Sequence, residues 1–203
     1  MKIKICGLFR SEDISYANEA LPDYIGFVFA PSRRQITPGK AAELKKMLDV
    51  RIKTVGVFVN SDIDFIAGMV HNNIIDAVQL HGSEDGNFVR ELRSKIPPEI
   101  PVIKAFSVSS AEDISAAESF PCDFMLLDNG KGGTGKAFAW ELLRGNMPEH
   151  VFLAGGVNTE NIADAVKLEP YCIDVSSGAE TDGFKDRSKI LKLVQTVRNS
   201  NVK

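Results

Sequence analysis

The sequence has few cysteines, no long apolar run and no large excess of charge of either sign. Its three cysteines, Cys6, Cys122 and Cys172, are far apart and odd in number. Neither a disulfide framework nor a CxxC metal site is therefore expected, and this cysteine usage fits a reducing cytoplasm. No apolar run approaches the roughly 18 residues that span a bilayer, and MKIKICGL at the N-terminus lacks the apolar stretch of a signal peptide.

The charge balance limits the partners that the chain is expected to bind. Lys and Arg total 24 against 27 Asp and Glu, which gives a formal net charge of -3. The basic residues are scattered, so they form no electrostatic footprint for nucleic acid or an anionic membrane. A small anionic ligand stays compatible, because a few local donors can bind it. The length of 203 residues predicts one domain over 1–203 rather than two.

Short apolar runs alternate with amphipathic segments along the whole chain. The strand-like runs occupy 2–6, 24–29, 53–59, 77–81, 101–106, 123–128, 151–155 and 172–177. Alternation of this kind indicates βα units and a parallel sheet. Eight units predict a single (β/α)₈ TIM barrel near the lower size limit of that fold, so some helices must be short. The alternative is an open doubly wound sheet, which usually needs five or six strands.

Helix-start residues follow most of the strand-like runs. A Ser, Thr or Asn side chain there can accept from backbone N–H groups that the first helical turn leaves unpaired. The expected starts are Ser11, Thr37 with Pro38 behind it, Ser61, Ser83 and either Asn158 or Thr159, and the last helix is expected near 186–199.

The strand ends define where function is expected, because barrels of this kind place their sites at the C-terminal ends of the strands. Residues at or just after those ends are Cys6, Arg33, Arg34, Asn60, His81, Asp128, Gly155, Gly156, Ser176, Ser177 and Gly178. Cys122 and Cys172 fall at strand starts on the opposite face. We interpret those two as small buried apolar side chains.

Glycines and serines after the seventh and eighth runs predict a phosphate site. Glycine lets the backbone approach an anion closely, and exposed N–H groups supply donors. Strand alternation puts Ser176 and Ser177 on opposite faces, so only one of them is expected to reach a phosphate. The stretch NGKGGTGK at 129–136 approaches P-loop spacing, but Ala137 replaces the hydroxyl residue that binds magnesium. We interpret it as a loop that adds N–H groups for phosphate or substrate.

Cys6 and Asp128 can form an acid–base pair in one pocket. A free thiol is only a few per cent thiolate at pH 7, and nearby positive charge increases that fraction. A carboxyl group donates a proton poorly at neutral pH unless a water-poor pocket disfavours its charged form. Groups with such opposite requirements suit acid–base chemistry.

Motifs along nearly the whole chain resemble those of the phosphoribosylanthranilate isomerase family. They are KICGL at 4–8, GFVFAPSRRQITP at 26–38, VGVFVN at 55–60, AVQLHG at 77–82, IKAF at 103–106, LLD at 126–128, GGTGKAFAW at 132–140, LAGGVNTENI at 153–162 and DVSSGAE at 174–180. The resemblance implies an Amadori rearrangement of N-(5′-phosphoribosyl)anthranilate to 1-(2-carboxyphenylamino)-1-deoxyribulose 5-phosphate in tryptophan biosynthesis. It implies neither a metal nor an organic cofactor, and it leaves monomer and homodimer open.

The resemblance also implies roles for particular residues. Cys6 matches the general base of the family and Asp128 the general acid. Arg34 matches the arginine that binds the anthranilate carboxylate, with Arg33 as the neighbouring alternative. The remaining expected substrate-binding residues are Asn60, His81, Gly132, Gly133, Gly155, Gly156, Ser177 and Gly178. After CGL the family usually has Thr, where this chain has Phe9.

Three other functions are weighed against this one. A metal-dependent epimerase needs several ligands at strand ends, and of the three histidines only His81 falls there. A Schiff-base aldolase on a phosphosugar needs a lysine with a lowered pKa, and Lys104 and Lys4 are the candidates. We expect both lysines instead to pair inside the barrel with an acid such as Asp174, because buried charges require partners. A non-catalytic phosphate-ligand-binding barrel would need neither an acid nor a base.

Overall fold

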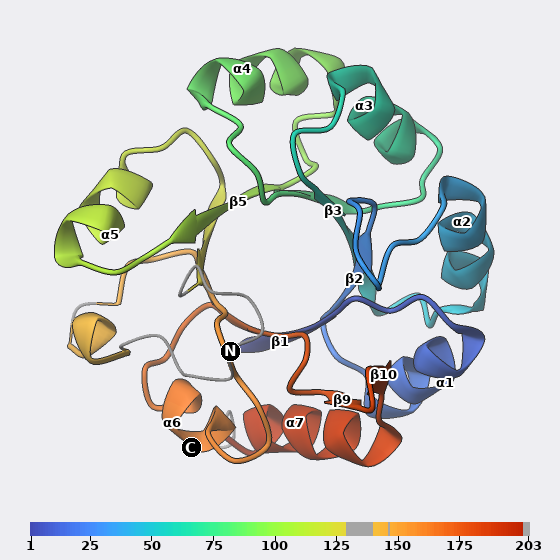
Figure 1. The fold of residues 1–203 in the computed structure, drawn as a ribbon, viewed down its shortest axis with the longest axis vertical. Coiled ribbons are helices and arrows are strands. Elements are labelled where there is room, and N and C mark those ends of the chain that lie inside the picture. Colours follow the sequence, from blue (N-terminus) through green and yellow to red (C-terminus); the bar gives the residue numbers. More distant parts are fainter. Residues whose placement is uncertain (129–139, 146, 201–203) are drawn as a thin grey trace.

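A closed parallel barrel surrounded by helices makes up the structure (Figure 1). The computed structural model describes residues 1–128, 140–145 and 147–200. The strands pair in sequence order and β8 pairs with β1. They are β1 (Lys2–Cys6), β2 (Tyr24–Val28), β3 (Lys53–Phe58), β4 (Ala77–Leu80), β5 (Val102–Ser107), β6 (Phe124–Asp128), β7 (Val151–Leu153) and β8 (Cys172–Val175). The predicted (β/α)₈ barrel is confirmed, and the open sheet is wrong.

Helices cover the outside of the barrel, as Figure 1 shows. They are α1 (Ser11–Ala20), α2 (Pro38–Met47), α3 (Ile63–His71), α4 (Gly86–Lys95), α5 (Ala111–Glu118), α6 (Ile162–Val166) and α7 (Arg187–Ser200), with a 3₁₀ turn at Trp140–Leu143. The helical segments after β5 and β6 are short, as the chain length required: α5 has 8 residues and the 3₁₀ turn has 4. A small antiparallel hairpin, β9 (Glu180–Thr181) and β10 (Phe184–Lys185), follows β8 and was not predicted.

Two of the expected helix caps show how local sequence sets a helix start. Thr37 caps α2 as predicted, because its side chain accepts from the backbone N–H of Lys40 and Pro38 follows it. Ser11 does not cap α1. Arg10 holds that position, and Asp13 reaches back to accept from the backbone N–H groups of Phe9 and Arg10. A carboxylate one turn inside the helix therefore replaces the expected serine.

The caps predicted at Ser61 and Ser83 are also wrong, since an aspartate lies nearer to each helix. Asp62 accepts from two backbone N–H groups at the start of α3, and Asp85 accepts from that of Phe88 in α4. α6 begins at Ile162, later than expected. The side chain of Asn158 instead accepts from the backbone N–H groups of the turn that precedes this helix.

The barrel interior is apolar in its lower part and polar towards its C-terminal end. Its apolar cluster contains Val55, Ala77, Ile103, Leu126, Phe152, Ala154 and Cys172. Strand alternation places the residue two positions further along on the same face and nearer the C-terminal end. Leu126 is thus followed by Asp128, and Cys172 by Asp174, and both acids line the cavity at that end. The polar layer forms the floor of the region where barrel sites lie.

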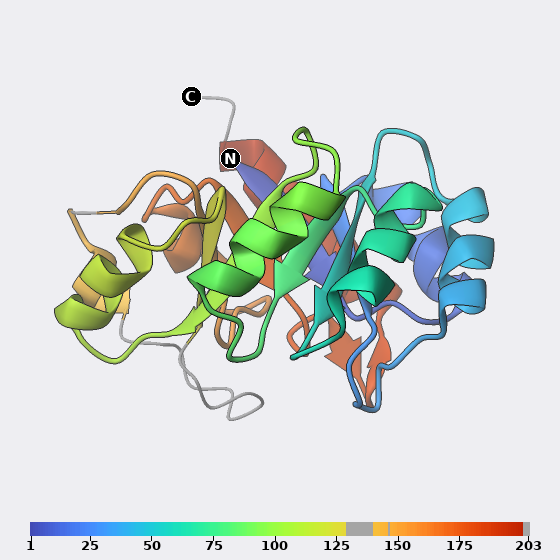
Figure 2. The same cartoon turned by 90° about the horizontal axis from the view of Figure 1, so that it is seen from above.

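The C-terminal end of the barrel also carries the unpredicted hairpin. Figure 2 shows the red β9–β10 hairpin beside the blue loop that follows β2, on the side of the barrel opposite the N-terminus. Arg33 and Arg34 in that loop contact Glu180 of β9, so the two segments are linked as well as adjacent.

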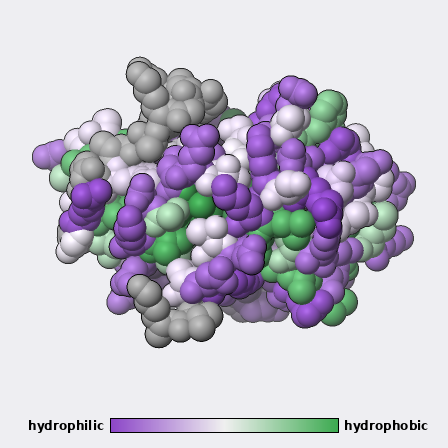
Figure 3. All heavy atoms as spheres, turned by 90° about the horizontal axis from the view of Figure 1, so that it is seen from below, coloured by the Kyte–Doolittle hydropathy of each residue, from purple (hydrophilic) through white to green (hydrophobic). Residues whose placement is uncertain are grey.

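The side of the molecule in Figure 3 presents hydrophilic residues interrupted by smaller hydrophobic groups. Such mixed polarity is ordinary for a protein surface, where apolar atoms contribute much of the accessible area. Within the part of the chain that the structure describes, no helix is both long and apolar enough to cross a membrane.

Candidate active site

A cavity of about 630 Å³ lies at the C-terminal ends of the strands. It brings together most of the residues that the sequence singled out: Cys6, Arg33, Arg34, His81, Asp128, Gly155, Gly156, Ser176 and Ser177. Apolar walls come from β2 and β3 through Val28 and Val57. A mostly apolar cavity with a few converging polar groups is the usual form of a small-molecule site.

Two of the expected substrate-binding residues, Asn60 and Gly178, are not in that lining. Gly132 and Gly133 lie outside the described residues. Asn60 lies in the loop after β3, where its side-chain oxygen accepts from the backbone N–H and the hydroxyl of Ser83 at 2.8 and 3.0 Å. Gly178 forms a bridge with Asn158, and a Cβ on Gly178 would collide with the carbonyl oxygen of Val157. Asn60 and Gly178 thus hold neighbouring loops together.

Cys6 ends β1 with its thiol at the cavity and only 7% of the residue exposed. Gly26 of β2 makes room for it, because a Cβ there would lie 2.6 Å from the Cys6 sulfur. Burial raises the pKa of the Cys6 thiol, whereas the ammonium groups of Lys4 and Lys185 act to lower it. The thiol is therefore hard to ionise in itself and depends on two nearby cations for its thiolate form.

Lys4 lies two residues before Cys6 on the same face of β1 and is fully buried. Its Nζ is 3.0 Å from Oδ1 of Asp174, the residue opposite it on β8. Burial opposes the charge, but the neighbouring Asp174 carboxylate raises the pKa of Lys4 above its ordinary value. The pairing of Lys4 with Asp174 inside the barrel is confirmed.

Lys104 does not join that pair, and this part of the expectation is wrong. Its Nζ donates to the carbonyl oxygen of Gly82 at 2.7 Å and lies 3.3 Å from the Glu84 carboxylate. Its β5 neighbour Ile103 belongs to the barrel-interior cluster, so alternation turns Lys104 outward. Neither lysine candidate for a Schiff base lines the cavity.

Asp128 faces the cavity from the end of β6. Its Oδ1 is buried and has no hydrogen-bond partner within the described part of the chain. Since a buried polar atom without a partner is costly, this oxygen is suited to a ligand. His81 stands nearby on β4, and its Nδ1 lies 2.9 Å from Nε2 of Gln79. Burial lowers the pKa of His81, although the Asp128 charge raises it, so the imidazole is neutral at pH 7.

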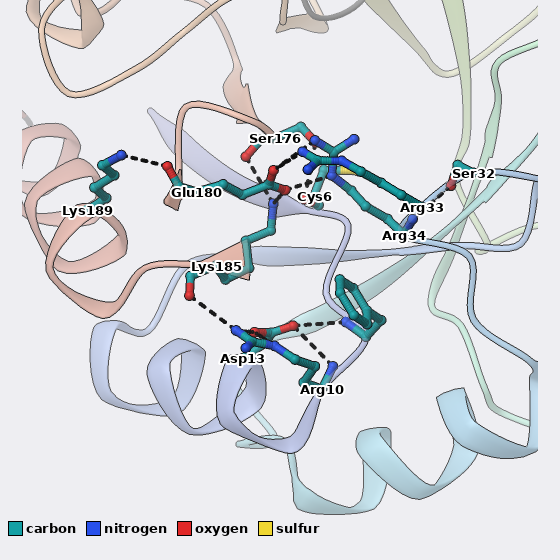
Figure 4. A network of polar contacts seen from close by, with 11 residues as sticks. Cys6, Arg10, Asp13, Ser32, Arg33, Arg34, Ser176, Glu180, Lys185 and Lys189 are labelled. Carbon is teal, nitrogen blue, oxygen red and sulfur yellow. Dashed lines mark hydrogen bonds and ion pairs between the residues drawn. The ribbon is translucent and has the colours of Figure 1, made fainter. Parts of the chain in front are cut away.

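A cluster of charges borders the cavity beside Cys6 (Figure 4). Arg34 donates from Nε and Nη2 to the two carboxylate oxygens of Glu180 at 2.6 and 2.9 Å. Arg33 pairs with the same carboxylate, and Lys185 of β10 donates to it at 2.7 Å. Sequence reasoning missed Glu180 and Lys185, because the hairpin that carries them has only two residues in each strand. The signal for Glu180 was limited to the motif DVSSGAE, and Lys185 lies outside that motif.

The glycine and serine segments after β7 and β8 adjoin each other. Gly155 and Gly156 have φ of 84° and 77°, a left-handed conformation that favours glycine. Ser176 donates its hydroxyl to the carbonyl oxygen of Cys6 at 3.4 Å, whereas Ser177 is exposed at the cavity. Both serines line the cavity, but the hydroxyl of Ser176 already has the Cys6 carbonyl as its acceptor.

Metal ligands could come from the His, Cys, Asp and Glu side chains of residues 1–128, 140–145 and 147–200. No group of three or more His, Cys, Asp or Glu side chains able to hold a metal ion occurs there. Cys172 is buried and Cys122 half-buried, and all three cysteines are free thiols.

The fold and the cavity together define a class, that of (β/α)₈-barrel enzymes with a thiol, a carboxyl group and glycine-rich turns at adjoining strand ends. Within this class the chain belongs to the N-(5′-phosphoribosyl)anthranilate isomerase family, whose model matches residues 3–196.

Relatives of known sequence and structure agree with that family. The chain is 47% identical over 203 residues to an N-(5′-phosphoribosyl)anthranilate isomerase of Endomicrobium trichonymphae, with 98% of each chain covered. It is 34% identical to a monomer form of a dimeric phosphoribosylanthranilate isomerase from Thermotoga maritima, with a TM-score of 0.83 and coverage of 98% and 99%. A third structure, 33% identical with a TM-score of 0.82 and the same coverage, is a phosphoribosylanthranilate isomerase in complex with reduced 1-(o-carboxyphenylamino)-1-deoxyribulose 5-phosphate.

Proposed function

We propose that this chain catalyses the Amadori rearrangement of N-(5′-phosphoribosyl)anthranilate to 1-(2-carboxyphenylamino)-1-deoxyribulose 5-phosphate, a step of tryptophan biosynthesis. Membership of the isomerase family supports the reaction. The observation that carries the mechanism is that Cys6 and Asp128, on β1 and β6, open into one cavity. Residues 1–203 act as one domain, which the pairing of β1 with β8 supports.

Asp128 serves as the general acid and Cys6 as the general base. Asp128 donates a proton to the ribose ring oxygen, the C1′–O bond breaks, and the nitrogen lone pair forms a C1′=N bond. The Cys6 thiolate then removes the C2′ proton, and the electrons of that C–H bond move towards the imine to give an enolamine. The enolamine becomes the aminoketose when C1′ gains a proton and the C2′ hydroxyl loses one. Exchange with solvent restores both side chains, and the substrate's own nitrogen carries the electron pairs.

The remaining residues bind the two anionic groups of the substrate. Arg34 binds the anthranilate carboxylate, since a guanidinium matches two carboxylate oxygens. Gly155, Gly156 and Ser177 bind the phosphate through backbone N–H groups and a hydroxyl. The commitment of Ser176 to the Cys6 carbonyl supports the choice of Ser177. His81 contacts the substrate from the cavity lining, Gly132 and Gly133 bind it through backbone N–H groups, and Asn60 and Gly178 hold the loops around the cavity.

The test follows the fluorescence of the anthranilate-containing substrate after the pure protein is added. We expect enzyme-dependent decay with the wild type and a loss of about 100- to 10,000-fold in kcat for Cys6→Ala and for Asp128→Asn. Cys122→Ala, at a cysteine away from the cavity, is the matched control and should keep full activity. Wild-type protein without activity would favour a non-catalytic phosphate-binding barrel. Near-normal turnover in either site variant would overturn the acid–base assignment.

Location and assembly are separate parts of the proposal. We place the enzyme in the cytoplasm, which its three free thiols support. It acts as a monomer or a homodimer, and light scattering at micromolar concentration distinguishes the two.

A further inference from the structure

Glu180 is a buried carboxylate with no part in the proposed proton transfers. Its side chain is only 4% exposed, and it lies on β9, outside the barrel strands. Arg34 donates to both of its carboxylate oxygens, Arg33 to Oε2 and Lys185 to Oε1. Burial disfavours its charge, but the hydrogen bonds from Arg34 and Lys185 keep the pKa of Glu180 below its ordinary value.

The contact between Glu180 and Arg34 leaves part of the guanidinium available. A guanidinium has five N–H donors, one on Nε and two on each terminal nitrogen. Glu180 takes the edge formed by Nε and Nη2. The edge formed by Nη1 and the second hydrogen of Nη2 stays outside that contact, and it is equally suited to a carboxylate. One guanidinium can thus be held by an internal carboxylate and still bind another.

The position of Arg34 is fixed from a second side by Gly7. Gly7 has φ of 83°, and a Cβ on it would collide with Cδ of Arg34. The arginine stem therefore lies directly against the backbone next to Cys6. The location of the guanidinium is in this way tied to that of the thiol, and both line the same cavity.

The charges around Glu180 do not cancel. Three cations share one carboxylate (Figure 4). The cluster therefore keeps a net positive charge at the edge of the cavity. A carboxylate that only neutralised a buried arginine would not need two further cations. The surplus favours a second anion at this edge, and the available edge of Arg34 can receive it.

We propose that Glu180 is a positioning residue that holds Arg34 edge-on, so that the free edge of the guanidinium selects substrates with a carboxylate beside the anilino nitrogen. This inference rests on the proposed isomerase function. It extends that function by assigning substrate selection to the β9–β10 hairpin. Glu180 does not touch the reacting atoms, so it acts on substrate binding through Arg34.

The experiment compares two substrates with Glu180→Gln. One is N-(5′-phosphoribosyl)anthranilate, and the other is the phosphoribosylamine of aniline, which lacks the carboxylate. We expect Glu180→Gln to raise KM for the carboxylate substrate about tenfold with kcat within about threefold, since one charge-assisted contact is lost. KM for the aniline substrate should change less than about twofold. Arg34→Met should remove the discrimination between the two substrates altogether.

Controls separate positioning from stability of the hairpin. Thr181→Val removes a hydrogen bond to Asp186 in the same hairpin, 2.8 Å long, and leaves the arginines untouched. This variant should change neither KM nor kcat for either substrate. If Glu180→Gln does not fold, Glu180→Asp keeps the charge, shortens the reach and should give a smaller selective rise in KM. Thermal unfolding of each variant shows whether the protein is intact.

The outcomes separate failure of this inference from failure of the proposed function. Equal loss with both substrates, or no change with either, would show that Glu180 only secures the hairpin and would overturn its positioning role. Wild-type protein that turns over both substrates equally well would instead remove the carboxylate-binding role of Arg34, and this inference with it. Wild-type protein without activity on either substrate would reject the isomerase function itself.

Discussion

Two buried lysines approach Cys6 from different parts of the molecule, and their charges are held in different ways. Lys4 lies inside the barrel and has Asp174 of the neighbouring strand as its partner. Lys185 lies on the hairpin and shares Glu180 with two arginines. The pKa of Lys4 is raised despite burial, whereas burial lowers the pKa of Lys185 in spite of Glu180.

The difference shows that the pKa of a buried lysine depends on how many cations share its carboxylate partner, as well as on whether it has such a partner. Asp174 serves Lys4 alone among the ion pairs of the described residues, and its attraction together with that of Cys6 outweighs the cost of burial. At Lys185 the Arg34 guanidinium repels the ammonium and competes for the same oxygens. The barrel thus provides a fixed cation under the thiol, and the hairpin provides one whose protonation is more easily lost.

The largest expected difference is in stability. Lys4→Met leaves Asp174 without its cation and should lower the free energy of unfolding by about 3–5 kcal/mol. Lys185→Met leaves Glu180 with both arginines and should cost about 1–2 kcal/mol. Urea unfolding at pH 7 measures both. The pair Lys4→Met/Asp174→Asn should regain much of the loss, and equal costs for the two single variants would contradict the comparison.

The second-largest expected effect of removing either lysine is on the pKa of Cys6. Burial raises its pKa and the two ammonium groups lower it, so removing either cation should raise it further. The limb of kcat/KM that rises with pH should move to higher pH, more for Lys4→Met than for Lys185→Met. A rise of one unit lowers the rate below the pKa about tenfold.

The thiolate absorbance against pH gives an independent measurement of the same group. It is best made in a Cys122→Ser background, which removes the half-buried thiol of Cys122. Cys172 can stay, because its full burial raises its pKa well above the ordinary value of a thiol. The Asp174 charge acts in the opposite direction on Cys6, so Asp174→Asn alone should lower the thiol pKa. A thiol pKa that stays constant across these variants would show that neither lysine supports the thiolate.

A smaller perturbation acts on the hairpin only. Gly183 lies between β9 and β10 with φ of 84°, and a Cβ there would meet Nη1 of Arg33. Gly183→Ala should therefore cost about 1 kcal/mol through backbone strain. Because Arg34 is not displaced, KM should stay within about twofold. A large rise in KM would mean that Arg33 takes the role assigned to Arg34.

The smallest effect is a difference in slope at alkaline pH. Lys4 has a raised folded pKa, so its contribution to stability is complete below 10.5, the ordinary value, and is lost above it. Lys185 has a lowered folded pKa, so the unfolded chain binds more protons and its contribution grows as pH rises towards 10.5. Urea unfolding between pH 8 and 10 should therefore show a stability difference between wild type and Lys185→Met that changes with pH by less than about 1 kcal/mol, whereas the difference between wild type and Lys4→Met should stay constant.

Local sequence predicted most of the fold. The apolar runs predicted eight strands in the right order, with ends at most two residues from those observed, since a short β-branched run between turn residues favours a buried strand. Helix caps were less predictable. Thr37 was correct, but aspartates near Ser11, Ser61 and Ser83 accept the backbone N–H groups instead.

The residues of the site were likewise predictable from the sequence only in part. Cys6, His81 and Asp128 could be assigned to one cavity because strand ends converge in any such barrel. The hairpin could not be predicted, because two-residue strands leave no periodicity. Nor could Lys4 be distinguished from Lys104, since both faces of a parallel strand are buried and alternation alone does not tell which faces inward.

By itself, the sequence determined the barrel, the family to which its motifs belong and the strand-end residues, all of which depend on neighbours along the chain. Only the tertiary structure decided that Lys4 pairs with Asp174, that Asn60 holds Ser83, and that Glu180 gathers two arginines and a lysine. Apart from the contact of Glu180 with Lys185, five positions away, these contacts join residues from 23 to 170 positions apart. Their energies depend on burial and on which charges share a partner, and both of these exist only after the barrel has closed.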